Sequence, residues 1–230
     1  MLFVSPTFKK IFLIRFLGYF FIQLGILALI LTVEPVVSEE LRYRFNDLTG
    51  KHYSLPRVVT SQGENNQPSS SLGSLNLGGT EMITPVSTDF GIVIEKINAN
   101  AKVVPDVNPS DEKSYMAALS QGVAHAKGTS YPGQKGNIYL FSHSTDAPWN
   151  IVRFNAIFFL LGKLEPEDRV IMFYQGRRYD YIVFDKRVVP PSETKYLTDK
   201  YDQSVLTLQT CDPPGTILNR LIIRAKLVES

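Results

Sequence analysis

The sequence is short of cysteine, tryptophan and histidine, with one, one and three of these residues among 230, and it has little net charge. A single cysteine cannot close an intrachain disulfide, so in an exported chain it either pairs with another chain or remains a free thiol. The formal net charge of +2 is spread along the chain and forms no basic patch, which argues against a nucleic-acid partner. With 44% apolar residues, the chain can form one good-sized core, so we expect one folded domain with additional segments.

One long apolar run lies near the N-terminus, at residues 16–33, and it follows the basic residues Lys9, Lys10 and Arg15. At ~1.5 Å per residue, a helix of this length crosses most of a ~30 Å hydrocarbon core. Since the positive charges precede the run, residues 1–15 are expected in the cytoplasm and the remaining chain outside the cell. The pattern predicts a single-pass protein of the cell membrane.

A cleaved signal peptide is the alternative, with the small residues Val36 and Ser38 near the cleavage site. The uncleaved anchor is favoured because the apolar run exceeds the roughly 7–15 residues typical of a signal sequence. After it, residues 34–87 are expected to form an extracellular stalk and flexible linker. Residues 61–80 have few large apolar side chains and cannot bury enough surface to fold alone.

Residues 88–230 have the pattern of a folded β-domain. Short apolar or alternating segments are separated by turn signals, and they predict strands over residues 90–97, 101–104, 137–141, 169–174, 178–189, 204–211 and 219–228. One helix is expected after Asn108 as N-cap, with Pro109 at its first position, ending before Gly122. Many short strands with little helix indicate an all-β barrel or sandwich.

The only cysteine, Cys211, ends a strand and is followed by a turn rich in proline and glycine at residues 212–216. A second strand begins at Asn219, and pairing of the two strands brings Arg220 back near the height of Cys211. Arg224 would lie roughly 13 Å further along at ~3.3 Å per residue, so Arg220 is the better partner for the thiol.

The segment Thr207-Leu208-Gln209-Thr210-Cys211, followed by Arg220, resembles the Thr-Leu-x-Thr-Cys and downstream arginine signature of the sortases, which are membrane-anchored cysteine transpeptidases. The segment 122–137, before a histidine, is also similar, and the likeness covers roughly residues 90–228. It implies an all-β domain with short helices, a closed eight-stranded sortase-type β-barrel, preceded by an N-terminal transmembrane helix. It does not assign a sortase subclass.

Three histidines are candidates for the catalytic base. His52 lies in the stalk, and His125 is expected at the end of the helix as a structural residue. His143 follows the apolar strand 138–141 and opens a loop, where functional groups are often displayed by a rigid scaffold. It matches the family's catalytic histidine, although Ser142 stands where many sortases have glycine.

The resemblance implies that Cys211 attacks a peptide carbonyl in a C-terminal sorting signal and forms a thioacyl intermediate. His143 would protonate the leaving amine and later deprotonate the amine acceptor. Arg220 would hold the oxyanion or fix the substrate backbone. Thr210 either helps to shape the pocket or is an inward-facing strand residue. The expected partners are surface proteins that carry a sorting signal and an amine acceptor, which is a cell-wall peptide or a pilin lysine.

No cofactor is expected and no metal site is predicted. Glu193, Asp199 and Asp202 lie in a long loop where some sortases bind calcium, but three scattered acids are typical of a solvated surface. Two other functions remain open. The L,D-transpeptidases of the cell wall resemble a Ser-x-Gly-Cys-x-Arg pattern that this sequence does not match. A non-catalytic, surface-anchored β-barrel module would carry an incidental buried thiol, which would not react with thiol reagents.

Overall fold

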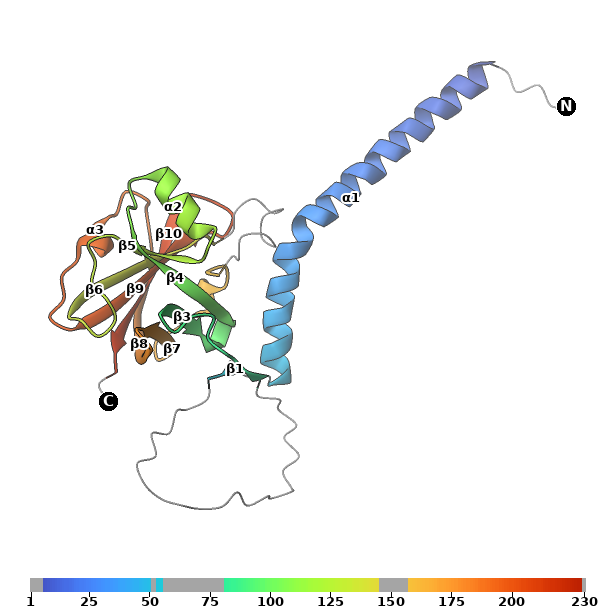
Figure 1. Ribbon diagram of the computed structural model, residues 1–230. Coiled ribbons are helices and arrows are strands. Elements are labelled where there is room, and N and C mark those ends of the chain that lie inside the picture. Colours follow the sequence, from blue (N-terminus) through green and yellow to red (C-terminus); the bar gives the residue numbers. More distant parts are fainter. Residues whose placement is uncertain (1–5, 51–52, 56–80, 145–156, 229–230) are drawn as a thin grey trace, which may run out of the picture.

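The structure, a computed structural model, describes residues 6–50, 53–55, 81–144 and 157–228. Its centre is a closed eight-stranded barrel with the strand order β10-β8-β7-β3-β4-β5-β6-β9. The strands are β3 (Phe90–Ile94), β4 (Ala99–Val107), β5 (Val123–Ala126), β6 (Gly136–Phe141), β7 (Arg169–Tyr174), β8 (Arg177–Val189), β9 (Ser204–Asp212) and β10 (Asn219–Leu227). The predicted closed barrel is confirmed, and Figure 1 shows it with helices at its periphery.

Two strand pairings bring distant parts of the sequence together. Strand β6 pairs with β9 in parallel, from Gly136 opposite Ser204 to Phe141 opposite Gln209. Strand β10 then pairs antiparallel with β9. The end of β6, the end of β9 and the start of β10 therefore lie together at one end of the barrel.

The barrel strands separate an inner core from an outer apolar cluster. Along β10, Leu221, Ile223 and Ala225 belong to the inner core, whereas Ile222 belongs to the outer cluster. This alternation is the one that the sequence predicts, and it follows from the period of two in a strand. The outer cluster also contains Ala118 and Leu119 of helix α2 (Glu112–Leu119) and Tyr196 of helix α3 (Lys195–Thr198).

The two strands predicted at residues 169–174 and 178–189 are present as β7 and β8, and they form a hairpin with its turn at Gln175 and Gly176. Both residues have positive φ, 51° and 73°, as expected for a two-residue turn that matches the twist of the strands. The predicted strand 90–97 is shorter than expected, because residues Glu95–Ile97 form a 3-10 turn, η1. Asn98, with φ 50°, then reverses the chain into β4.

The predicted start of the first helix is wrong. Asn108 accepts a hydrogen bond from the Ser110 backbone at 3.0 Å, which forms a local turn, and α2 begins only at Glu112 after Asp111. The predicted position of His125 at the end of that helix is also wrong. His125 lies in β5, a four-residue strand too short to show a clear alternating pattern.

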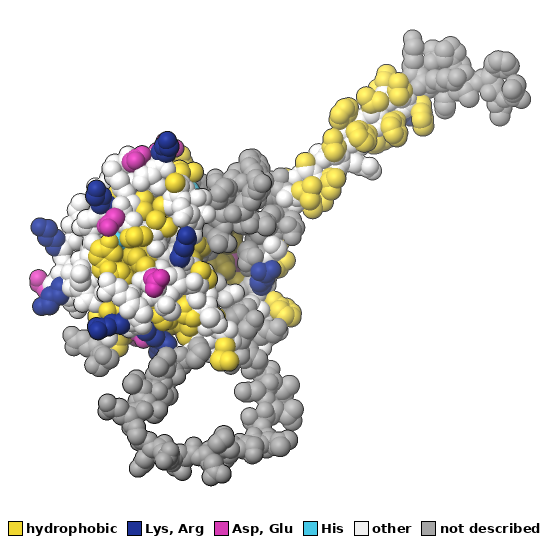
Figure 2. Space-filling view, in the orientation of Figure 1, with side chains coloured by type: hydrophobic (Ala, Val, Ile, Leu, Met, Phe, Trp, Pro, Cys, Tyr) yellow, Lys and Arg dark blue, Asp and Glu magenta, His cyan; other side chains and the backbone are white. Residues whose placement is uncertain are grey.

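Helix α1 (Pro6–Thr49) is longer than the predicted apolar span. Residues Phe12–Leu31 are long and apolar enough to cross a membrane, and their large apolar side chains are exposed. Figures 1 and 2 show this apolar part projecting away from the barrel. Residues 34–49, placed by the sequence in the stalk, continue the same helix.

The C-terminal half of α1 contacts the barrel. Lys163, in the 3-10 turn η3 (Leu161–Lys163), donates a hydrogen bond to Glu40 at 2.8 Å and lies over the Tyr43 ring at 5.3 Å. A parallel pair of short strands, β1 (Tyr53–Ser54) and β2 (Glu81–Met82), follows. Beside them Leu55 and Ile83 pack on Val93 and Ile171 of the barrel. Contacts with the barrel therefore begin well before residue 88.

Candidate active site

A groove of about 750 Å³ crosses the end of the barrel where β6, β9 and β10 meet. His143, Cys211 and Arg220 all line it, although they come from three parts of the sequence. Strand β9 carries the cysteine, β10 carries the arginine, and the histidine is the second residue after β6. The structure thus brings together the three residues that the sequence singles out.

Cys211 and Arg220 are direct partners in the β9–β10 pair. Directly opposite residues in an antiparallel pair project from the same face with Cβ atoms about 5 Å apart. The Arg220 guanidinium donates from Nη1 to the carbonyls of Asn219 at 3.1 Å and Ile217 at 3.3 Å. These contacts occupy one end of the guanidinium fork and hold it beside the groove. Arg224 pairs with Thr207 instead, further along the same ladder.

The backbone before His143 is fixed to the cysteine strand by two hydrogen bonds. The Ser142 amide donates to the Gln209 carbonyl at 3.1 Å, and Thr210 Oγ1 donates to the Ser142 carbonyl at 3.0 Å. Thr210 is 4% exposed and its hydroxyl is turned toward the β6 strand end. Thr210 is therefore a buried strand residue. Its hydroxyl also fixes the backbone at the start of the loop that carries His143.

Two residues of the groove floor were missed by the sequence reasoning. Tyr139 of β6 donates a hydrogen bond from its hydroxyl to Gln209 Oε1 on β9, and both residues line the groove. Burial raises the pKa of Tyr139 above its usual range, and the nearby positive charge of Arg220 opposes this shift. The sequence signal that could have identified them is a spacing of two residues, which places strand residues on the same face. Tyr139 and Phe141 precede His143 with this spacing, and Gln209 precedes Cys211 with it.

Helices α2 and α3 both contribute residues to the groove. Tyr115, Met116 and Leu119 line it from α2, and Leu197 lines it from α3. The α3 segment contributes Pro191, Glu193 and Thr194 as well. The walls are therefore largely apolar, and the polar groups concentrate on the floor at the strand ends, an arrangement typical of sites that bind and orient an organic ligand.

The other candidate groups of the sequence lie elsewhere. His125 is fully buried, with Nδ1 accepting from the Asp106 amide at 3.4 Å and Nε2 contacting the Ser130 carbonyl at 3.1 Å. These contacts fit a neutral, structural imidazole. Burial lowers its pKa, against the opposing effects of the Ser130 hydrogen bond and the Asp106 charge. His52 lies outside the described residues.

The loop acids have local partners. Glu193 accepts from the Lys195 amide at 3.1 Å, and Asp199 accepts from the Tyr201 hydroxyl at 3.2 Å. Within the described ranges, no three His, Cys, Asp or Glu side chains come together in a way that could hold a metal ion.

The closed eight-stranded barrel, with Cys211, His143 and Arg220 around one groove, has the fold and the groove residues that the sequence resemblance implies for a sortase. A family model for the Sortase domain matches residues 92–228, which is more than half of the chain. The chain belongs to the sortase family.

Individual relatives agree with this assignment. Sortase D of Bacillus subtilis (strain 168) is 28% identical over 138 residues, which are 59% of this chain and 61% of that protein. The match thus spans about three fifths of the length of this relative.

Solved structures show the same fold. Sortase C-1 from Actinomyces oris is 26% identical with a TM-score of 0.53, over 63% of this chain and 77% of that one. A lid mutant of sortase A from Corynebacterium diphtheriae is 24% identical with a TM-score of 0.52, over 63% of this chain and 72% of that one. The similar proteins carry the names of several sortase classes.

Proposed function

We propose that this protein is a cysteine transpeptidase that cleaves a C-terminal sorting signal and transfers the protein to an amine acceptor at the cell surface. The observation that carries the proposal is the common groove of Cys211, His143 and Arg220 in a chain of the sortase family. Within the described part of the chain, Cys211 is a free cysteine and is partly exposed, as a nucleophile must be.

The chemistry follows from the residues available. The Cys211 sulfur attacks the scissile carbonyl, and the carbon–nitrogen bond breaks to leave a thioacyl-enzyme. His143 gives its proton to the departing amine. In the second half, His143 accepts a proton from the acceptor amine as this amine attacks the thioacyl carbonyl, and the thiolate leaves. Each half-reaction returns the imidazole to the state that the next one needs.

Arg220 stabilises the charge that develops on the carbonyl oxygen. Its guanidinium cannot lose its proton and carries several donors, so it favours a negative oxygen next to the sulfur that creates it. The position directly across the ladder from Cys211 supports this role. Thr210 has an indirect role, because it fixes the backbone before His143 and does not touch the substrate.

The apolar helix supports a membrane-anchored protein. In this proposal residues 1–15 lie in the cytoplasm, residues 16–33 form the transmembrane anchor, and the catalytic domain 88–230 lies outside the cell. The partners are then surface proteins with a sorting signal, and the acceptor is a cell-wall peptide or a pilin lysine.

The proposal is tested with the full chain in detergent, a library of internally quenched peptides and hydroxylamine as the acceptor. Wild type should release a fluorescent fragment, form a peptidyl hydroxamate and show a covalent peptide adduct on Cys211 by mass spectrometry. Cys211→Ala should lose all three signals, and His143→Ala should lose nearly all turnover. Cleavage by Cys211→Ala at the wild-type rate would show that the proposed nucleophile is wrong.

A further inference from the structure

One wall of the groove is a segment between β8 and β9 that contains α3, and polar contacts tie this segment to the barrel. Residues 196–201 cross the outer face of strands β6, β9 and β10. Leu197 of this segment lines the groove, as do Pro191 and Thr194 shortly before it. Such a connection has little regular structure of its own, so its position depends on these contacts.

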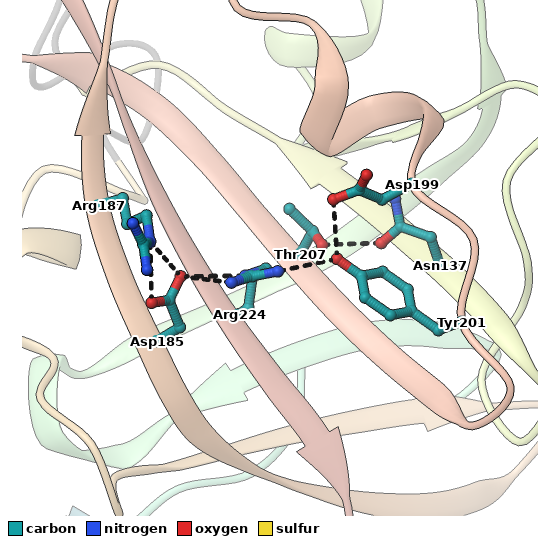
Figure 3. Close-up of polar contacts among 7 residues, drawn as sticks. All are labelled: Asn137, Asp185, Arg187, Asp199, Tyr201, Thr207 and Arg224. Carbon is teal, nitrogen blue, oxygen red and sulfur yellow. Dashed lines mark hydrogen bonds and ion pairs between the residues drawn. The ribbon is translucent and has the colours of Figure 1, made fainter.

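The first contact involves Thr207, the opening residue of the Thr-Leu-Gln-Thr-Cys segment. Its hydroxyl donates to Asn137 Oδ1 at 2.7 Å (Figure 3). This fixes the orientation of the Asn137 amide, whose Nδ2 donates to the carbonyls of Tyr196 at 2.8 Å and Leu197 at 3.4 Å. Thr207 and Asn137 are 0% and 6% exposed, so water does not readily replace either partner.

The second contact involves Arg224 of β10. Its Nε and Nη2 donate to Asp185 Oδ2 at 3.0 and 2.9 Å, and its Nη1 donates to the Tyr201 hydroxyl at 3.1 Å (Figure 3). The Tyr201 hydroxyl donates in turn to Asp199. The guanidinium also lies 5.5 Å from the centre of the Tyr196 ring. Asn137 therefore holds the N-terminal end of the 196–201 segment, and Arg224 holds its C-terminal end.

Neither contact includes a residue that reacts. Thr207 is four positions before Cys211 on the same face of the strand, which corresponds to ~13 Å. Arg224 is four positions beyond Arg220, and its donors are directed to Asp185 and Tyr201. A direct effect of these residues on the thiol, the imidazole or the oxyanion is not supported by this spacing.

We infer that Thr207, Asn137 and Arg224 are positioning residues that set the α3 wall of the groove and thereby select which peptide binds. Helix α2 also lines the groove, with Tyr115, Met116 and Leu119, so the ligand selected is an extended peptide with apolar side chains that contact the two helices. The inference rests on the proposed function for its substrate class. It assigns to Thr207 a role in peptide selection that is separate from the chemistry at Cys211.

The test uses a pool of acetyl-tetrapeptidyl chloromethyl ketones with varied sequences, which alkylate a thiol and release chloride. Mass spectrometry of the full chain gives the relative amount of each adduct on Cys211. Iodoacetamide is the control reagent, because it is small enough to alkylate Cys211 without binding along the groove. Wild type should prefer a subset of the peptides. Thr207→Val, which keeps the shape but lacks the hydroxyl, should lose about tenfold of that preference, as expected for one buried hydrogen bond.

Thr207→Ser keeps the hydroxyl and should restore the wild-type preference, while the iodoacetamide rate should stay within about twofold in both variants. Tyr201→Phe removes the hydroxyl that joins Arg224 to Asp199 and should weaken the preference in the same direction. The Tyr201→Phe variant takes the place of Thr207→Val in the test if Thr207→Val does not fold. The inference is overturned if wild type shows no preference, if folded variants retain it, or if the iodoacetamide rate falls as much as the peptide rate. A selective Cys211 that transfers no acyl group would instead refute the proposed function alone.

Discussion

Cys211 and Arg220 face each other directly across the β9–β10 ladder, so the backbone hydrogen bonds of the hairpin fix the two residues relative to each other. In the proposed mechanism, a cation at this position stabilises both the attacking thiolate and the oxyanion that forms on the substrate carbonyl. Four residues along, the same ladder places Arg224 in a structural network instead. The two arginines of β10 therefore have different expected mutational effects.

Arg220→Gln should lower kcat by about a hundredfold or more, the loss typical for removal of an oxyanion donor. The protein should remain folded, because Arg220 is only partly buried. The measurement is steady-state cleavage of the best quenched peptide. Arg187→Gln is the matched control, since Arg187 is 58% exposed at its side chain and lies outside the groove. Equal losses in both variants would contradict the assignment.

Thr210→Val should lower kcat about tenfold with little change in KM. The substitution keeps the side-chain volume but leaves the buried Ser142 carbonyl without its donor, so the backbone that leads into His143 loses one of its two ties to β9. Thr210→Ser should restore the rate. A Thr210→Val enzyme as active as wild type would show that this hydrogen bond does not position His143.

His125 should make the folded domain less stable as the pH falls below about 6.5. Burial lowers the pKa of His125 in the folded state, whereas the unfolded chain binds the proton near the ordinary histidine value. The unfolded state therefore gains protons first, and the free energy of unfolding decreases toward acid. Chemical denaturation at pH 7.5 and 5.5 gives the change. In His125→Gln, which cannot titrate, the difference between the two pH values should shrink. An unchanged difference would assign the effect to other groups.

Glu40 and Lys163 should govern the docking of α1 on the barrel. The hydrogen bond from Lys163 holds the pKa of Glu40 below its usual value, Arg44 adds to this effect, and burial opposes it. Both side chains are about one third exposed, so Glu40→Gln should change global stability by less than about 1 kcal/mol. Backbone amides of residues 36–49 should nevertheless exchange faster with deuterium. Leu48→Ala, at a position of the same helix where the side chain is 86% exposed, is the control and should leave this exchange unchanged.

The individual strands and the convergence of Cys211 with Arg220 could be predicted from sequence because both rest on local patterns. Local patterns alone left a barrel or a sandwich open, and the closed eight-stranded barrel followed from the resemblance to the sortases. Strands β9 and β10 show clear alternation, and the Thr-Leu-Gln-Thr-Cys segment with Arg220 lies on one hairpin, where counting residues gives the register. The chain reversal after Cys211 also has strong turn signals in Pro213, Pro214 and Gly215.

The remaining features depend on contacts between distant residues, which no local pattern encodes. β5 has four residues and pairs in parallel with β4, so its sequence around His125 resembled a helix end. The extension of α1 past the apolar run is accompanied by contacts of Glu40 and Tyr43 with the barrel. Tyr139 and Gln209 lie 70 positions apart and meet only through the parallel β6–β9 pair.

The hairpin that carries the thiol has a consequence for variation of the chain. The ladder that aligns Cys211 with Arg220 begins at Asp212 and Asn219, and the residues between them take no part in that pairing. Ile217 and Leu218 in this connection are 79% and 66% exposed. Natural or engineered changes in the sequence of residues 213–218 can therefore alter this side of the groove while the backbone pairing of Cys211 with Arg220 is kept.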